Sequence, residues 1–175
     1  MKFLVTGSSG LVGSQVVKDL VEQNHIVHSC YHNEKPLYGI PMILDLTDNE
    51  KIIQKIQEIK PDVIIHLAAM TNVDLCETEK ELSLQINSKA TKILAKQAAK
   101  QNAFFIYMST DYIFDGIDGM KKENDLPNPL GFYGRSKLEG ESILKKLTSS
   151  WCIARTSTPF GIHPKKNSFP LWVKE

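Results

Sequence analysis

Three glycines at fixed spacing, Gly7, Gly10 and Gly13, lie between a short apolar run and an amphipathic stretch. The run at residues 3–6 predicts a buried strand, and the apolar positions of residues 11–23 recur with the period of a helix. In such a turn Gly7 permits the tight bend, Gly10 leaves room for a pyrophosphate, and Gly13 allows helix and strand to pack closely. The positive end of the helix dipole favours an anion at the same place. The sequence therefore predicts a dinucleotide-binding unit, although glycine triplets also occur in ordinary tight turns.

Strand and helix patterns alternate along the rest of the chain. Further strands are expected at residues 26–31, 42–44, 62–69, 103–108 and 151–154, and further helices at residues 48–60, 81–101 and 133–147. Asp48 can cap the first of these helices, which must stop before Pro61. Strands separated by helices run parallel through right-handed crossovers. The predicted fold class is therefore α/β, with a Rossmann-type doubly wound parallel sheet.

A tyrosine and a lysine four residues apart, Tyr133 and Lys137, lie in the last predicted helix. This spacing places both side chains on one face of the helix. A lysine ammonium beside a phenol favours the phenolate, so we expect the pKa of Tyr133 to fall below its usual value of about 10. The phenol could then act as an acid or base near neutral pH, and the hydroxyl of Thr110 could hold a substrate carbonyl or alcohol. Such pairs also occur by chance on solvated helices, and the glycine turn is what favours the catalytic interpretation.

The residues at the end of the second strand indicate which cofactor the turn accepts. An NAD site places an acid there, where it accepts a hydrogen bond from the ribose 2′-hydroxyl. This chain has Tyr31, His32 and Asn33 at that point, and Glu34 comes a few residues too late. A 2′-phosphate is repelled less where no carboxylate stands, and His32 or Lys35 could attract it. We therefore predict NADP, with NAD as the alternative.

Asp45 follows the predicted third strand and has two interpretations. It is placed to accept a hydrogen bond from an adenine amino group, or to begin the next helix as a capping carboxylate. The sequence leaves both open.

Three histidines, His25, His28 and His32, are spaced loosely enough to suggest a metal site. Along a strand, however, His25 and His28 point to opposite faces, and no cysteine or carboxylate of the pattern converges on them. We expect no bound metal.

The overall charge argues against two classes of partner. The chain has 21 basic and 20 acidic residues, and the net charge of +1 favours neither nucleic acid nor an anionic membrane.

No apolar run is long enough to span a bilayer, and the N-terminus reaches Gly7 too early for a signal-peptide core. Cys30, Cys76 and Cys152 are odd in number and form no C-x-x-C pair, as expected of reduced thiols. We predict a cytoplasmic protein.

These segments together resemble the extended short-chain dehydrogenase/reductase family, and most closely its dTDP-4-dehydrorhamnose reductase group. The matching segments are residues 7–13, 45–46, 61–69, 73–77, 109–116, 133–141 and 155–157. The resemblance covers essentially the whole chain, and the Ser-Thr-Asp-Tyr segment at residues 109–112 is fairly specific to this group.

The resemblance implies roles for individual residues. Thr110, Tyr133 and Lys137 match the catalytic trio of the family. Cofactor contacts are implied for Tyr133 and Lys137, for the turn residues Gly7, Ser9, Gly10, Leu11, Val12 and Gly13, for Asp45 and Leu46, and for Leu67, Ala68 and Ala69. Family members with a magnesium-bridged dimer have a glutamate at the position of Gln15, so we do not carry the metal over. A homodimer remains open.

The function that the resemblance implies is reduction of a nucleotide-linked sugar. Hydride from NADPH would add to the C4 ketone of a nucleotide-linked 4-keto-6-deoxysugar while Tyr133 protonates the alkoxide. Lys137 would hold the nicotinamide ribose, and Thr110 would bind the carbonyl oxygen. Asp111 would either orient Thr110 or cap the segment that follows.

Three other functions are consistent with the same segments. An NAD-dependent nucleotide-sugar epimerase or dehydratase would use the same trio and regenerate its cofactor. A non-catalytic NADP-binding regulatory subunit would bind a partner enzyme, and the beta subunit of methionine adenosyltransferase is similar over these motifs. An isolated cofactor-binding fragment would bind NADP without turnover.

The length of 175 residues suits one ordinary domain. We expect a dinucleotide-binding Rossmann domain at residues 1–158. Residues 159–175 contain three prolines and end on a pattern typical of the start of a helix. We interpret them as the start of a truncated substrate-binding lobe, most of which is absent.

Overall fold

The computed structural model of the protein describes residues 1–146, 150–161 and 163. Its strands are β1 (Lys2–Thr6), β2 (Ile26–Tyr31), β3 (Ile40–Ile43), β4 (Val63–His66), β5 (Phe104–Thr110) and β6 (Trp151–Thr156). Its helices are α1 (Leu11–Glu22), α2 (Asn49–Ile59), α3 (Val73–Thr78), α4 (Lys80–Leu84), the π-helical turn η1 (Gln85–Lys89), α5 (Ala90–Lys100), the 3₁₀ turn η2 (Asp111–Ile113) and α6 (Phe132–Leu144).

The strands form a six-stranded sheet in the order β3-β2-β1-β4-β5-β6, and every pair is parallel. β1 lies at the centre, where Phe3 is paired with Val27 of β2 on one side and with Val63 of β4 on the other. The order reverses between β1 and β4, and such a reversal opens a crevice at the carboxyl ends of the strands. The predicted α/β doubly wound parallel sheet is confirmed.

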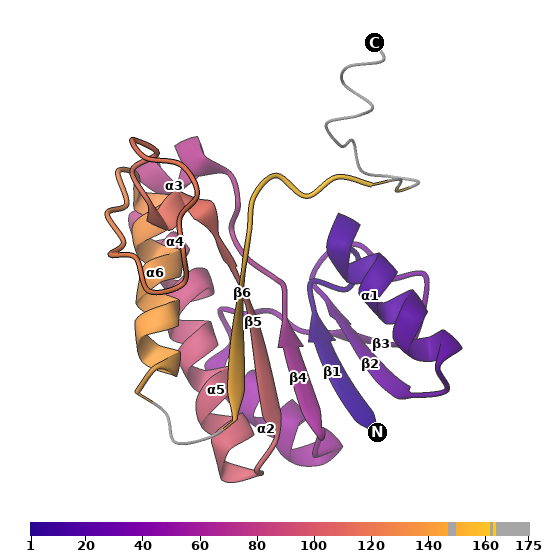
Figure 1. The fold of residues 1–175 in the computed structure, drawn as a ribbon. Coiled ribbons are helices and arrows are strands. Elements are labelled where there is room, and N and C mark those ends of the chain that lie inside the picture. The colour runs from indigo at the N-terminus through magenta and orange to yellow at the C-terminus, as the bar shows by residue number, and fades with distance from the viewer. Residues whose placement is uncertain (147–149, 162, 164–175) are drawn as a thin grey trace.

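Helices pack on both faces of the sheet and divide the core into two clusters (Figure 1). On one face, Leu4, Ile64 and Phe105 pack against Ile56 of α2 and Leu94 of α5. On the other face, the strand residues that alternate with these pack against α1 around its fully buried Val17. The alternation follows from the two-residue period of a strand, which points successive side chains to opposite faces.

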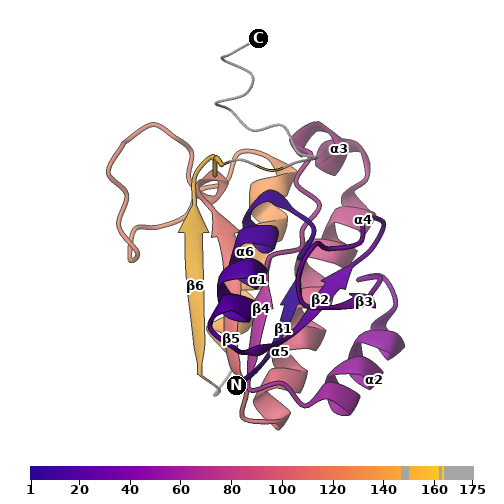
Figure 2. The ribbon, with the colours of Figure 1, turned by 90° about the vertical axis from the view of Figure 1, so that its right-hand side faces the viewer.

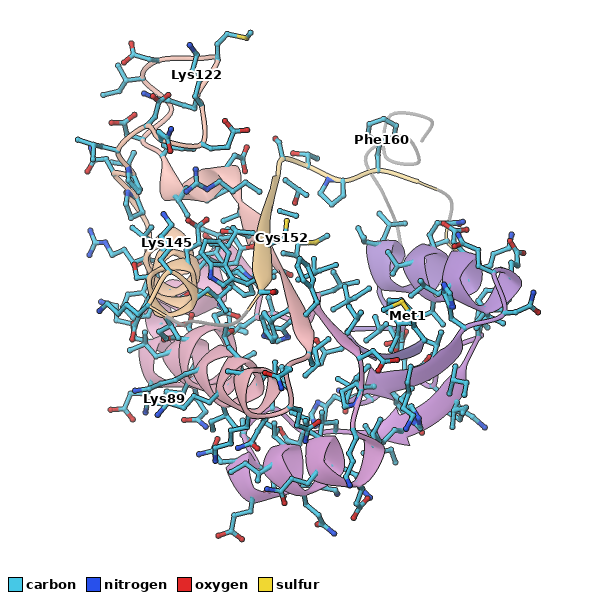
Figure 3. All side chains as sticks on the ribbon, turned by 60° about the horizontal axis from the view of Figure 1, so that its bottom comes forward. Met1, Lys89, Lys122, Lys145, Cys152 and Phe160 are labelled. Carbon is cyan, nitrogen blue, oxygen red and sulfur yellow. The ribbon has the colours of Figure 1, made fainter. Side chains whose placement is uncertain are left out.

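β6 is an edge strand and is less covered than the central strands. Figure 2 shows α1 lying over the central strands, with β6 uncovered on that side, and Figure 3 labels the exposed Cys152 that β6 carries. Within the described residues, no helix is long and apolar enough to cross a membrane.

The predicted limits of α2 agree with its hydrogen bonds. The side chain of Asp48 accepts a hydrogen bond from the backbone N–H of Lys51 at 2.9 Å, which caps the first turn. Lys60 takes a left-handed conformation at the other end, with φ of 49°, and Pro61 follows. The helix therefore begins and ends at the residues that local chemistry indicates.

Two predicted helices differ from the observed ones. Residues 81–101 were expected to form one regular helix, but the π-helical turn η1 at Gln85–Lys89 separates α4 from α5. Residues 73–78 were not assigned to any element, yet they form α3, whose first turn Asn72 caps by accepting from the N–H of Leu75 at 2.9 Å. The turn η1 contains the buried Asn87, which contacts α6, whereas the start of α3 is set by the exposed cap of Asn72; hydrophobic periodicity reports neither contact.

The remaining boundaries shift by a few residues. β3 begins and ends earlier than the predicted 42–44, and β4 is shorter than the predicted 62–69. β5 and β6 each extend two residues beyond their predicted ends. The predicted helix 133–147 is observed as α6, and Leu147 lies outside the described residues, as do residue 162 and residues 164–175 of the predicted lobe.

A buried ion pair fastens α6 to β6. The carboxylate of Glu141 is fully buried and accepts from Nε and Nη2 of Arg155 at 2.9 and 2.7 Å. A third guanidinium N–H donates to the carbonyl oxygen of Glu123 in the loop between η2 and α6. Burial is the largest influence and would raise the pKa of Glu141, but the hydrogen bonds from Arg155, acting together with the positive charges of Arg155 and Lys145, hold the pKa below its usual value.

We expect Arg155→Met to lower the free energy of unfolding by about 3–5 kcal/mol, because it leaves a buried carboxylate unpaired. The loss should be present at neutral pH and should shrink as the pH falls through the folded-state pKa of Glu141, since the pair stabilises only the ionised carboxylate. Urea unfolding measures both effects. The exposed pair of Lys55 and Glu58 is the control, and Lys55→Met should cost no more than about 1 kcal/mol. Equal losses in the two variants would contradict the assignment.

Candidate functional site

The glycine turn after β1 leaves no room for side chains. Gly7 has a φ of +70°, and a Cβ added to it would lie 2.7 Å from the backbone nitrogen of Ala68. A Cβ added to Gly13 would lie 2.0 Å from the carbonyl oxygen of Gly7. Gly10, the residue before α1, cannot cap the helix with a side chain, and the first turn has no acidic residue. The helix start therefore keeps the unpaired N–H groups and positive potential that an anion requires.

A cavity of about 950 Å³ opens beside this turn, at the carboxyl ends of the strands. Every residue that the sequence predicted for the site lines it: the six turn residues, Asp45 and Leu46, residues 67–69, and Thr110, Tyr133 and Lys137. These residues come from five separate stretches of the chain. The fold thus brings the predicted cofactor and catalytic residues together in one place.

Lys137 is held at the base of the cavity. Its side chain is only 3% exposed, its Nζ donates to the carbonyl oxygen of Met108 at 2.7 Å, and it lies 4.1 Å from the ring centroid of Tyr107. Burial lowers the pKa of Lys137 to about 7, against the opposing charge of Glu141 one helical turn away. The ammonium therefore changes its charge near neutral pH.

Tyr133 is the second residue of α6 and is partly buried. Burial raises the pKa of its phenol, and a hydrogen bond with Thr110 offsets only part of the rise. The expected lowering of this pKa by Lys137 is therefore wrong for this structure, because the ammonium donates to Met108 and desolvation of the phenol prevails. The phenol is protonated at neutral pH, which is the form that can donate a proton.

Thr110 and Asp111 form a fixed pair at the end of β5. The hydroxyl of Thr110 accepts from the N–H of Tyr112 at 3.2 Å and donates to Oδ1 of Asp111 at 3.2 Å. Thr110 therefore caps η2, and Asp111 orients its hydroxyl. Of the two roles left open for Asp111, the hydrogen bond favours orientation. The ring of Tyr112 meets that of Tyr133 edge-on, with centroids 5.7 Å apart.

Asp45 forms hydrogen bonds with the chain that follows it. Its Oδ1 accepts from the backbone N–H and the hydroxyl of Thr47, both at 2.8 Å, and these bonds lower its pKa. Its Oδ2 lies 3.8 Å from Nε2 of His32, which also lines the cavity. Asp45 therefore forms the turn that precedes α2, but Asp48 and not Asp45 caps that helix. The other carboxylate oxygen of Asp45 lies near His32, just after β2.

Sequence reasoning missed two residues that hold α6 in place. Glu77 of α3 accepts from the backbone N–H of Phe132 at 2.5 Å, and so supplies the first turn of α6 with the carboxylate that its own N-cap, Gly131, lacks. Asn87, in η1, is 1% exposed and donates to the hydroxyl of Ser136 in α6 at 2.9 Å. The sequence signal for Asn87 was a polar residue on the buried side of a predicted helix, whereas Glu77 lay in a stretch assigned to no helix or strand.

A comparison with protein families identifies the group. The model of the RmlD substrate binding domain matches residues 1–172 of this chain. The chain belongs to the RmlD family.

Three relatives show how much of the RmlD fold this chain spans. A probable low-salt glycan biosynthesis reductase, Agl14, from Haloferax volcanii is 39% identical over 99% of this chain and 59% of its own length. Methionine adenosyltransferase 2 subunit beta from Xenopus tropicalis is 37% identical over 90% of this chain and 47% of its own length. The crystal structure of a dTDP-4-dehydrorhamnose reductase from Bacillus anthracis in complex with NADP superposes with a TM-score of 0.82, at 32% identity over 96% of this chain and 56% of that one. The chain therefore spans about half the length of the RmlD relatives it matches.

We expect Gly13→Ala to weaken NADPH binding by this RmlD-family chain about tenfold or more, because the added methyl group forces the turn away from α1. Gly119→Ala is the matched control, since a Cβ there meets nothing within 4 Å. Fluorescence titration with NADPH measures both variants. Wild-type affinity in Gly13→Ala would show that the turn does not hold the dinucleotide.

Proposed function

We propose that this chain is the dinucleotide-binding part of an NADP-dependent reductase that acts on a nucleotide-linked 4-keto-6-deoxysugar, in the manner of dTDP-4-dehydrorhamnose reductase. The observation that carries the proposal is the single cavity that the glycine turn shares with Thr110, Tyr133 and Lys137. Membership in the RmlD family supports it, as do the relatives described as reductases. Because the chain spans about half the length of those relatives, the activity is proposed for the full-length protein.

The cavity fits a dinucleotide in two respects. The turn is closed to side chains at Gly7 and Gly13, so backbone alone faces an incoming pyrophosphate. Leu67, Ala68 and Ala69 supply apolar lining, and Lys137 and Tyr133 line the same cavity. The strand β2 ends at Tyr31, and neither Tyr31 nor the following His32 is an acid, which supports NADP over NAD. Glu34, three residues after the strand, also lines the cavity.

The reaction we propose needs one acid and one oriented hydroxyl from the protein. The bound cofactor would supply a hydride. Tyr133, protonated because of its raised pKa, would donate its phenolic proton to the developing alkoxide. Thr110, which donates its hydroxyl proton to Asp111 in this structure, would redirect that proton to the carbonyl oxygen of the substrate. The ammonium of Lys137 one turn away would stabilise the phenolate left behind.

We also propose a domain division for the full-length protein. Residues 1–158 would form the cofactor-binding domain, and residues 159–175 would begin a substrate-binding lobe. Ile106 and Met108 of β5 are paired with Cys152 and Ala154 of β6 on the face where α1 lies, and Cys152 is exposed. Parallel sheets are normally covered on both faces, so we expect the rest of the full-length protein to cover this area.

Oxidation of NADPH in the presence of dTDP-4-dehydrorhamnose tests the proposal on the full-length protein. Tyr133→Phe removes one hydroxyl, and we expect it to lower kcat by about 10²–10⁴-fold while NADPH affinity stays within about twofold. Tyr38→Phe, at an exposed phenol outside the cavity, is the control. Unchanged turnover in Tyr133→Phe would remove this residue from the reaction.

A second function is favoured by the similarity to methionine adenosyltransferase 2 subunit beta, at 37% identity. In that case the protein would bind NADP and a partner synthetase and would reduce no sugar. Co-purification with a methionine adenosyltransferase from the source cells, together with no NADPH oxidation, would support it.

NAD retained through purification would instead indicate an epimerase or dehydratase.

A further inference from the structure

His66, the last residue of β4, is a buried titratable group that the proposed reaction does not use. Its side chain is 1% exposed and lies between Thr6 of β1 and Thr91 of α5. Burial, and to a smaller extent the positive charge of Lys137, lowers the pKa of His66 to about 3. The imidazole is therefore neutral at physiological pH, with one ring nitrogen protonated and the other free to accept.

The neighbouring hydroxyls determine which nitrogen carries the proton. Thr91 donates its single hydroxyl proton to the carbonyl oxygen of Asn87 at 2.8 Å, so it must accept from Nε2 of His66 at 3.0 Å. Nδ1 of His66 is then the acceptor, and the hydroxyl of Thr6 donates to it at 2.7 Å. Thr6 in turn accepts from the backbone N–H of Ala68 at 3.2 Å. In every one of these hydrogen bonds the donor is thus on the Ala68 side and the acceptor on the Asn87 side.

One end of this path lies in the cavity wall, and the other leads to the helix that carries Tyr133. Ala68 belongs to the segment that lines the cavity beside the glycine turn. Asn87 belongs to η1 and donates from its side chain to the hydroxyl of Ser136 at 2.9 Å. Ser136 then donates to the backbone carbonyl of Tyr133 at 2.8 Å. A continuous set of buried contacts therefore joins the cofactor wall to the helix that carries the proposed acid.

We propose that His66 is a positioning residue, which holds the cofactor-lining segment 67–69 at a fixed distance from the start of α6. It does so through the chain of hydrogen bonds from Ala68 to Asn87, here called the bridge. The inference rests on the proposed function, since it assigns the bridge to the cofactor and acid of that site. Thr6, Thr91 and Asn87 are the other members of the bridge.

An imidazole suits this place for two reasons. It presents a donor and an acceptor on opposite sides of a rigid ring, which the amide of Asn or Gln does not. It also remains uncharged beside the ammonium of Lys137, whereas a cation at this place would oppose the charge on that lysine. A phenyl ring of similar size would leave the hydroxyl proton of Thr6 without an acceptor and the hydroxyl oxygen of Thr91 without the ring N–H donor.

Nitrogen NMR of the histidine rings in the full-length protein tests the direction of the bridge without any turnover. We expect His66 to show a protonated Nε2 and an unprotonated Nδ1, with no titration between about pH 5 and 8. The reverse tautomer, or a titration within that range, would overturn the inference.

Thr91→Val tests the positioning role, because it removes the acceptor of the Nε2 proton and keeps the shape of the side chain. We expect the amide signals of residues 67–69 to shift and the Kd for NADPH to rise on the order of tenfold. Ser88→Ala is the matched control: Ser88 is equally buried in η1, and its hydroxyl has no hydrogen-bond partner among the described residues. A loss of stability in Thr91→Val with unchanged NADPH affinity would show a purely structural contact and overturn the inference.

The two proposals fail differently. A wild-type protein that binds no dinucleotide would contradict the proposed function, and the positioning role would fall with it. A wild-type protein that binds and uses NADPH, with Thr91→Val unaltered in both respects, would refute the role of His66 alone.

Discussion

The site depends on a close approach of two stretches of backbone that leaves no space for a side chain. The turn after β1 meets the chain that leaves β4, and a methyl group on Gly7 would lie 2.7 Å from the backbone of Ala68. The same requirement recurs at α6, where a Cβ on Gly134 would lie 2.2 Å from the carbonyl oxygen of Tyr112. Because backbone packs directly on backbone, the turn, the cofactor wall and the start of α6 occupy fixed relative positions.

Desolvation sets the charges within this frame. It lowers the pKa of Lys137 to about 7 and raises that of Tyr133, so that each side chain moves toward its neutral form. A protonated phenol is the form that a reductase needs when it delivers a proton to a carbonyl oxygen. The buried pair of Glu141 and Arg155 holds the same helix against β6, and so keeps Lys137 beneath the cavity.

The sequence predicted the fold well where the information is local. Asp48 and Pro61 marked the limits of α2, and the alternation of strands and helices required a parallel sheet. The sequence did not predict contacts between residues that are far apart in the chain. Asn87 lay in a predicted helix as an ordinary polar residue and Glu77 in a stretch assigned to no element, and only the folded chain shows that both contact α6. The expected pKa shift of Tyr133 was wrong for the same reason, since neighbours one turn apart say nothing about burial.

A crystal structure of the full-length protein with NADP would show where the dinucleotide lies. We predict the pyrophosphate at the turn of Gly7, Gly10 and Gly13, and the nicotinamide beside the phenol of Tyr133 and the ammonium of Lys137. A dinucleotide bound elsewhere on the molecule, or a nicotinamide turned away from both side chains, would contradict this prediction.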